Sequence, residues 1–147
     1  MRTIINKHCN ELRMLTVRNY VENEVNFNMT VWIGEVPGDG PTCETAMCIG
    51  GTASFLMSLE NKKQPTFSEY QVSDWLGLDR AMGMRLFYCR DDNTPVHEVI
   101  TNEHWYRLYN VTREQALQAI DNVIADGAPH WDVICADHDR LYARNNA

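Results

Sequence analysis

The chain has 147 residues and a formal net charge of −7; 44% of its residues are hydrophobic and 22% are charged. This composition is typical of a globular domain with a buried core and excludes an intrinsically disordered chain. The acidic balance argues against broad, non-specific binding to nucleic acid or to an anionic membrane, because contact with phosphate needs a basic face.

The sequence predicts a single domain, residues 1–147, in the cytoplasm. The first residues contain no apolar stretch of the kind found in signal peptides, and no run approaches the roughly 18 apolar residues that a membrane helix needs. Five cysteines, an odd number, fit a reducing compartment better than a disulfide framework. No internal repeat or low-complexity segment marks a domain boundary.

Two segments begin the chain. Residues 4–24 carry Ile5, Cys9 and Leu12, followed by Leu15 or Thr16, at helical spacing, and they predict a first helix. Asparagines then interrupt the pattern. Residues 27–33 fit either a short strand or, as we favour, an extended segment packed on the core.

A loop rich in proline and glycine precedes the most apolar helix predicted in the chain. Residues 36–41 hold two prolines and two glycines, which end any helix or strand. Thr42 can cap the next helix, in which nearly every side chain is apolar or small. A helix that is apolar on all sides is a buried helix. We therefore expect residues 43–60 to form the central helix, with Gly50 and Gly51 where another helix crosses closely.

Capping signals mark the shorter helices that follow. A short helix capped by Thr66 or Ser68 is expected to end at Gly77, and Asp79 caps the next helix, 80–88. Thr101 starts a helix at 101–108, and Thr112 caps a helix at 113–126, which Gly127 ends. A short apolar piece at 131–134 and a polar end complete the chain. Together these elements predict an all-α fold, a single compact domain of five or six mostly short helices packed around residues 43–60.

Several short motifs occur in order between about residues 27 and 131. They are FNM-x-x-W, then C-x-T-x-x-C-I-x-G-x-A from Cys43, W-L-G-L from Trp75, V-T-R-E-Q-A, and a closing glycine before Trp131. In these motifs the chain resembles a family of short proteins of bacteria and their phages. That family has no assigned activity, so the resemblance supplies no catalytic residues. It implies a helical fold and a phage or mobile-element origin, with the host cytoplasm as the location. Glu44 departs from the pattern, since the family has glycine there.

Cys43 and Cys48 are weak candidates for a metal or redox site. They stand five positions apart, whereas a zinc knuckle places two cysteines two to four positions apart in a turn. We therefore favour packing roles for both thiols. Cys43 keeps a chemical alternative, a cysteine-dependent enzyme or a redox site, because a thiol at a helix N-terminus has a lowered pKa.

No other cluster forms a catalytic or cofactor signature. The five histidines lack the H-E-x-x-H spacing, and the aspartates do not fit a calcium-binding loop. The glycines at 50–51 lack the lysine of a phosphate-binding loop. We therefore expect no cofactor and favour a non-enzymatic protein.

Residues 68–88 outline a helix–turn–helix with Gly77 in the turn. In this alternative, the second helix would enter the major groove of DNA, with Arg80 and Arg85 at bases or phosphates. Gly83 in mid-helix and the acidic chain argue against it, so binding to nucleic acid stays the minor hypothesis.

Aromatic side chains give the remaining clue to function. His104, Trp105, Tyr106 and Tyr109 fall within one short helix, which cannot hide all of its rings on one face. The 34–42 loop with Asp39 is a second candidate contact. We therefore expect a small, non-enzymatic interaction protein, phage- or mobile-element-encoded, that binds a protein partner through these residues.

Overall fold

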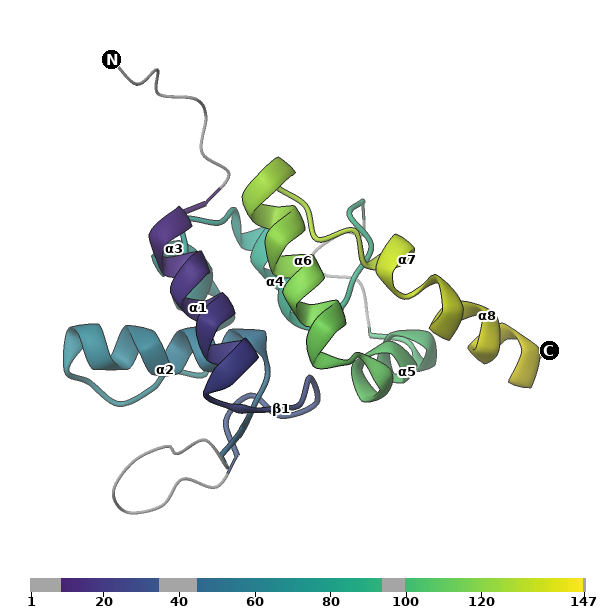
Figure 1. Cartoon of the computed structure of the whole chain (residues 1–147), viewed down its shortest axis with the longest axis horizontal. Helices are drawn as coiled ribbons and strands as arrows, with labels where there is room; N and C mark the ends of the chain where they lie inside the picture. Colours follow the sequence, from purple (N-terminus) through teal and green to yellow (C-terminus); the bar gives the residue numbers. More distant parts are fainter. Residues whose placement is uncertain (1–8, 35–44, 94–99, 147) are drawn as a thin grey trace.

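The computed structural model describes residues 9–34, 45–93 and 100–146, and these parts of the chain are mainly helical (Figure 1). The described ranges contain eight helices and two short strands. They are α1 (Glu11–Asn23), β1 (Asn26–Phe27), β2 (Ala46–Met47), α2 (Ile49–Asn61), α3 (Glu69–Trp75), α4 (Arg80–Tyr88), α5 (Asn102–Asn110), α6 (Arg113–Asp126), α7 (Trp131–Ile134) and α8 (Ala136–Asn145). The mostly helical architecture is confirmed, but the expected number of five or six helices was too low.

The first helix starts later than expected. The side chain of Asn10 accepts a hydrogen bond from the Arg13 N–H, which makes Asn10 the N-cap of α1. The helix therefore begins at Glu11, and the prediction of a helix from residue 4 was wrong for residues 9 and 10. Residues 4–8 of that prediction lie outside the described ranges.

The buried face of α1 also differs from the expected one. Met14, Val17 and Val21 are fully buried, whereas Leu12 and Leu15 are exposed. The three buried side chains are spaced three and four apart, which places them in one stripe along the helix. The expected face was therefore wrong at Leu12 and Leu15, whereas Val21, which continued the predicted pattern, is buried.

The buried helix α2 was predicted, but its start was not. Residues 45–48 are extended because their main chain pairs with the segment at 26–33. The strand β2 lies parallel to β1, and the Cys48 N–H donates to the Val31 carbonyl at 2.7 Å. The N-cap of α2 is Cys48, whose Sγ accepts the Gly51 N–H at 3.3 Å. The predicted helical residues 43 and 44 lie outside the described ranges. The segment at 27–33 thus contains part of a short strand and an antiparallel bridge, Ile33 to Met47.

The two glycines of α2 mainly make room for Trp32 of the extended segment, although a Cβ added at Gly50 would also lie 3.1 Å from the Phe87 ring of α4. A Cβ added at Gly51 would lie 1.4 Å from the Trp32 carbonyl oxygen, and one added at Gly50 would lie 2.3 Å from the indole ring. The indole meets Phe87 edge-on, with centroids 5.6 Å apart, and its Nε1–H donates to the Thr66 carbonyl. The extended segment therefore crosses α2 at main-chain contact distance.

Most of the predicted caps and helix ends after α2 are confirmed, although Ser68 and not Thr66 caps α3, and α5 extends past the predicted end at 108 to Asn110. Ser68 caps α3 and Asp79 caps α4, while Thr101 and Thr112 each form a capping box, at α5 and α6. Gly77 and Gly127 follow α3 and α6 with positive φ values of 69° and 89°, a backbone conformation that glycine adopts without strain.

Two groups of helices meet at α6 (Figure 1). On one side α2 packs on α1, α3 and α4, and α1 also packs along α6. On the other side α7 contacts α6, and α8 contacts α7 and α5. One hydrophobic cluster extends across both groups, from Cys9 to Cys135. The helix α2 is therefore central to the first group, while the later helices arrange themselves around α6 and one another.

The polar end predicted after residue 134 is a helix. The helix α8 has no buried residue and leads away from α7 to the C-terminus in Figure 1. Its lack of an apolar stripe explains why the sequence pattern did not reveal it. In the described part of the chain, no helix combines the length and apolar character needed to span a bilayer.

Candidate functional site

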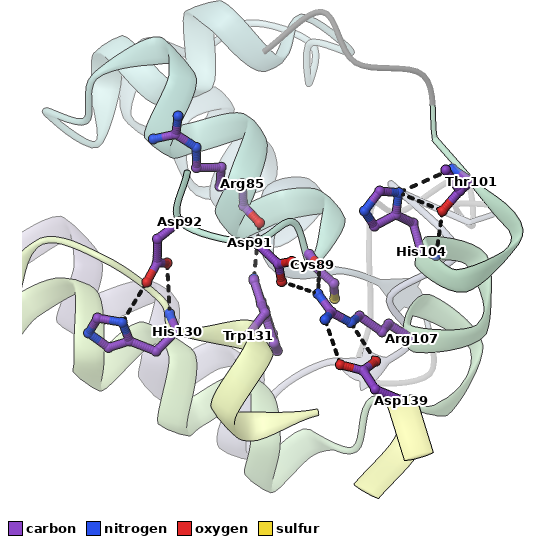
Figure 2. Close-up of polar contacts among 10 residues, drawn as sticks. All are labelled: Arg85, Cys89, Asp91, Asp92, Thr101, His104, Arg107, His130, Trp131 and Asp139. Carbon is purple, nitrogen blue, oxygen red and sulfur yellow. Dashed lines mark hydrogen bonds and ion pairs between the residues drawn. The ribbon is translucent and has the colours of Figure 1, made fainter. Parts of the chain in front are cut away.

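The helix α5 begins at a capping box that fixes one of the predicted contact residues. The Thr101 Oγ1 accepts the His104 N–H at 3.4 Å, and the His104 Nδ1 accepts the Thr101 N–H at 3.1 Å (Figure 2). These two bonds satisfy main-chain donors that the start of a helix otherwise leaves unpaired. His104 therefore holds the start of α5.

Trp105 and Tyr109 form an exposed aromatic pair on α5. They stand one turn apart, their ring centroids are 6.1 Å apart, and they are 42% and 72% exposed. Tyr106, in contrast, is half-buried and packs against Tyr142 of α8 at 5.6 Å. Of the four residues predicted on this helix, only this pair presents large aromatic surface to solvent. We call Trp105 and Tyr109 the α5 face.

Beneath the α5 face, a buried arginine fixes the helix in place. The Arg107 side chain is 4% exposed, and its Nε and Nη2 donate to the two carboxylate oxygens of Asp139 at 2.8 and 2.6 Å. Its Nη1 donates to Asp91 at 2.7 Å and to the Cys89 carbonyl at 2.9 Å (Figure 2). Burial alone would lower the pKa of Arg107, but the hydrogen bonds to Asp139 and Asp91 outweigh it and raise that pKa. The guanidinium thus ties α5 to α8 and to the residues that follow α4.

His130 forms a second charged junction. Its Nδ1 lies 2.7 Å from the Asp92 Oδ2, and its Nε2 lies 2.8 Å from the Asp126 Oδ2. Hydrogen bonds to Asp126 and Asp92 raise the pKa of the imidazole above 6.5. Because both ring nitrogens face carboxylates, the ring does not act as a base towards a substrate in this conformation.

A groove of about 490 Å³ runs between α6 and α7 beside His130. Amide side chains of α6 line one wall and two apolar side chains of α7 line the other; the lining residues are Glu114, Gln115, Gln118, Asn122, His130, Val133 and Ile134. Gln118 donates to Asn122, which donates to the Pro129 carbonyl. The groove is therefore polar on one side and apolar on the other, and His130 is among the residues that line it.

The described cysteines are buried thiols. Cys9, Cys48, Cys89 and Cys135 are reduced and buried. Burial raises the pKa of Cys48 to about 11 and that of Cys135 to about 12, and it raises the pKa of Cys89 as well. At neutral pH these groups are protonated, and a protonated thiol is a poor nucleophile and a poor metal ligand. Cys48 acts as a helix cap and core residue, while Cys43 lies outside the described residues.

The two arginines of the DNA-binding alternative are differently placed. Arg80, at the start of α4, pairs with Asp74 at 3.0 Å and lies over the Tyr70 ring. Arg85 is half-buried, and its carbonyl accepts the Trp131 Nε1–H at 3.0 Å. Apart from Arg80, every side chain of α4 is buried or half-buried, so the helix presents little surface to a DNA groove.

The two charged junctions were missed from sequence. Arg107 and Asp139 are 32 positions apart and His130 and Asp92 are 38 apart, and no motif links residues at such distances. Asp39, the other predicted contact, lies outside the described residues. In the described ranges, no group of three or more histidine, cysteine or acidic side chains could hold a metal ion.

Comparisons of the chain with protein-family models, curated proteins and solved structures found no match. The α5 face and the two charged junctions are therefore the structural features that bear on function.

Proposed function

We propose that the protein is a small interaction protein that binds a protein partner through the α5 face. The supporting observation is the pairing of Trp105 with Tyr109, two large rings in mutual contact and both open to solvent. Tryptophan and tyrosine are enriched among the residues that contribute most to binding energy at protein interfaces, because they bury a large area at low entropic cost.

The rigid mounting of the α5 face favours the same function. Arg107 lies two residues beyond Trp105 and two before Tyr109, and its guanidinium is fixed to Asp139, Asp91 and the Cys89 carbonyl. A face whose helix is already fixed loses little conformational entropy on binding. The α5 face is therefore prepared to bind without rearrangement of its own helix.

The resemblance to short proteins of bacteria and their phages completes this proposal. On that basis the chain is phage- or mobile-element-encoded, acts in the host cytoplasm and binds a host or phage protein. The cysteine-centred alternative depends on Cys43. The DNA-binding alternative depends on Arg80 and Arg85, of which Arg80 is already paired with Asp74.

The test compares two variants in a co-purification experiment with tagged protein from bacterial lysate. Trp105→Ser with Tyr109→Ser removes the α5 face, and Phe67→Ser removes an aromatic side chain that is 70% exposed elsewhere on the molecule. We expect the wild type and Phe67→Ser to retain the same stoichiometric partner and the double variant to lose it by at least about tenfold. Equal retention by all three proteins would count against the proposal, as would a wild type that retains nothing.

A further inference from the structure

His130 lies where three parts of the chain meet. Asp92 follows α4, Asp126 is the last residue of α6, and His130 directly precedes α7. In addition to the two ring contacts, the His130 main-chain N–H donates to the Asp92 Oδ1 at 3.2 Å (Figure 2). Asp92 therefore receives both the main chain and the ring of His130, while Asp126 receives the ring alone.

The backbone at His130 is strained and anchored. Its φ of 60° and ψ of 46° lie in the left-handed region, which is uncommon for residues other than glycine, although histidine is enriched there. The next residue, Trp131, is fully buried and donates its Nε1–H to the Arg85 carbonyl at 3.0 Å. The turn between α6 and α7 is thus held by the buried indole on one side and by the imidazole contacts on the other.

The contacts of the ring depend on its charge. A neutral imidazole has one N–H donor and one lone pair, so it can donate to only one of two carboxylates and repels the other. Donation to both Asp92 and Asp126 requires the imidazolium. Three other charged residues lie on the surrounding elements. Asp91 is paired with Arg107, and Glu114 lines the α6 wall of the groove. The Arg85 carbonyl accepts the Trp131 Nε1–H, and the Arg85 guanidinium points away from the His130 ring (Figure 2).

We propose that His130 is a proton-operated clasp that fastens the turn between α6 and α7, beside the groove that these two helices line. In the protonated state it joins Asp92 to Asp126. On losing its Nε2 proton it keeps Asp92 and releases Asp126, because Asp92 also holds the main-chain N–H and is the less exposed carboxylate, at 26% against 57%. The released Asp126 retains its contact with the Ala128 N–H, so the opening is confined to the turn at 127–130.

The direction of the pH effect follows from the raised pKa of His130. Hydrogen bonds to Asp126 and Asp92 raise that pKa above 6.5. The stabilisation by the clasp is therefore complete below pH 6.5 and is lost as the pH rises through the raised pKa of the folded protein. The turn is therefore fastened at the lower pH and released at the higher.

The clasp is tested by NMR titration of the His130 ring in three proteins. We expect a midpoint above 6.5 in the wild type and a midpoint lower by roughly 0.5–1 pH unit in Asp126→Asn, the modest size reflecting the solvent exposure of the ring. Asp132→Asn removes an exposed carboxylate two residues from His130 and is expected to leave the midpoint in place. A wild-type midpoint at or below 6.5, or equal midpoints in the two variants, would overturn the proposal.

A second measurement reads the opening itself. His130→Asn keeps a residue that tolerates positive φ but cannot be protonated. Between about pH 6 and about pH 9, we expect the wild type and Asp132→Asn to lose roughly 2–4 °C more in thermal midpoint than His130→Asn does, with falling amide protection at 128–133. If His130→Asn shows the same pH dependence as the wild type, no clasp operates. Should that variant not fold, the titration of Asp126→Asn still decides the question.

Discussion

Gly51 sits where the main chain of Trp32 touches α2, and the contact leaves no room for a side chain. Thr52 and Ser54 of α2 and Ser73 of α3 are also fully buried, and such small side chains allow close packing. Cys48 is another small buried residue with a structural role, because it fills a core position and its sulfur caps α2.

Gly51→Ala is expected to lower the free energy of unfolding by about 2–3 kcal/mol or more. The added Cβ would lie 1.4 Å from the Trp32 carbonyl oxygen, so the main chain has to move. Gly34→Ala is the matched control, because its Cβ would lie 3.3 Å from the Ala46 carbonyl oxygen and needs only a small adjustment. Urea unfolding measures both, and equal midpoints for the two variants would contradict the close approach of Trp32 to α2.

The helices differ in how far their own residues determine where they start and end. Four of them, α3 to α6, were predicted from capping residues because a cap is a local contact over two or three positions. The start of α2 was wrong because residues 45–48 pair with a segment about twenty positions earlier. The helix α8 was missed because it has no buried residue of its own and is anchored by residues of other helices, such as Arg107. Capping residues and local spacing cannot predict contacts between segments that are far apart in the sequence.

Arg107→Leu tests the anchoring of α5 to α8. It leaves the carboxylate of Asp139, which is 23% exposed, without its guanidinium partner, and we expect a loss of about 2–3 kcal/mol in the free energy of unfolding. Amide protection along α8 is expected to fall further than that of α6, because α8 has no buried residue of its own.

The control for that change is Arg140→Leu, which breaks an exposed pair with Asp137 on α8. Exposed pairs of this kind contribute roughly 0–1 kcal/mol. If Arg107→Leu and Arg140→Leu have the same effect on α8 protection, the buried guanidinium is not what holds the helix.

At the scale of the whole molecule, the candidate site was only partly visible in the sequence. Trp105 and Tyr109 were singled out because one helix could not bury every ring in its segment, and that argument needs no knowledge of other helices. The roles of His104 as a cap and of Tyr106 as a packing residue depend on Thr101 and on Tyr142. Arg107 and His130 acquire their roles only when separate parts of the chain meet.

The arrangement of the helices places the α5 face apart from the packing around α2. The helix α5 packs against α8 and joins α6 through a two-residue connection, away from α2 and its glycine contacts with Trp32 (Figure 1). Changes to the α5 face should therefore leave the packing of the first group of helices intact. This separation allows partner binding and folding to be measured independently.

Site-specific photocrosslinking tests the central claim most directly. A benzophenone amino acid is placed at Tyr109 in one protein and at Phe67 in another, two aromatic positions of nearly equal exposure, 72% and 70%, and each is irradiated in cells. If the α5 face binds the partner, we expect a discrete crosslinked adduct at Tyr109 that disappears when Trp105→Ser is added, and little or no adduct at Phe67. Adducts of equal yield at both positions, or an adduct at Phe67 alone, would contradict it.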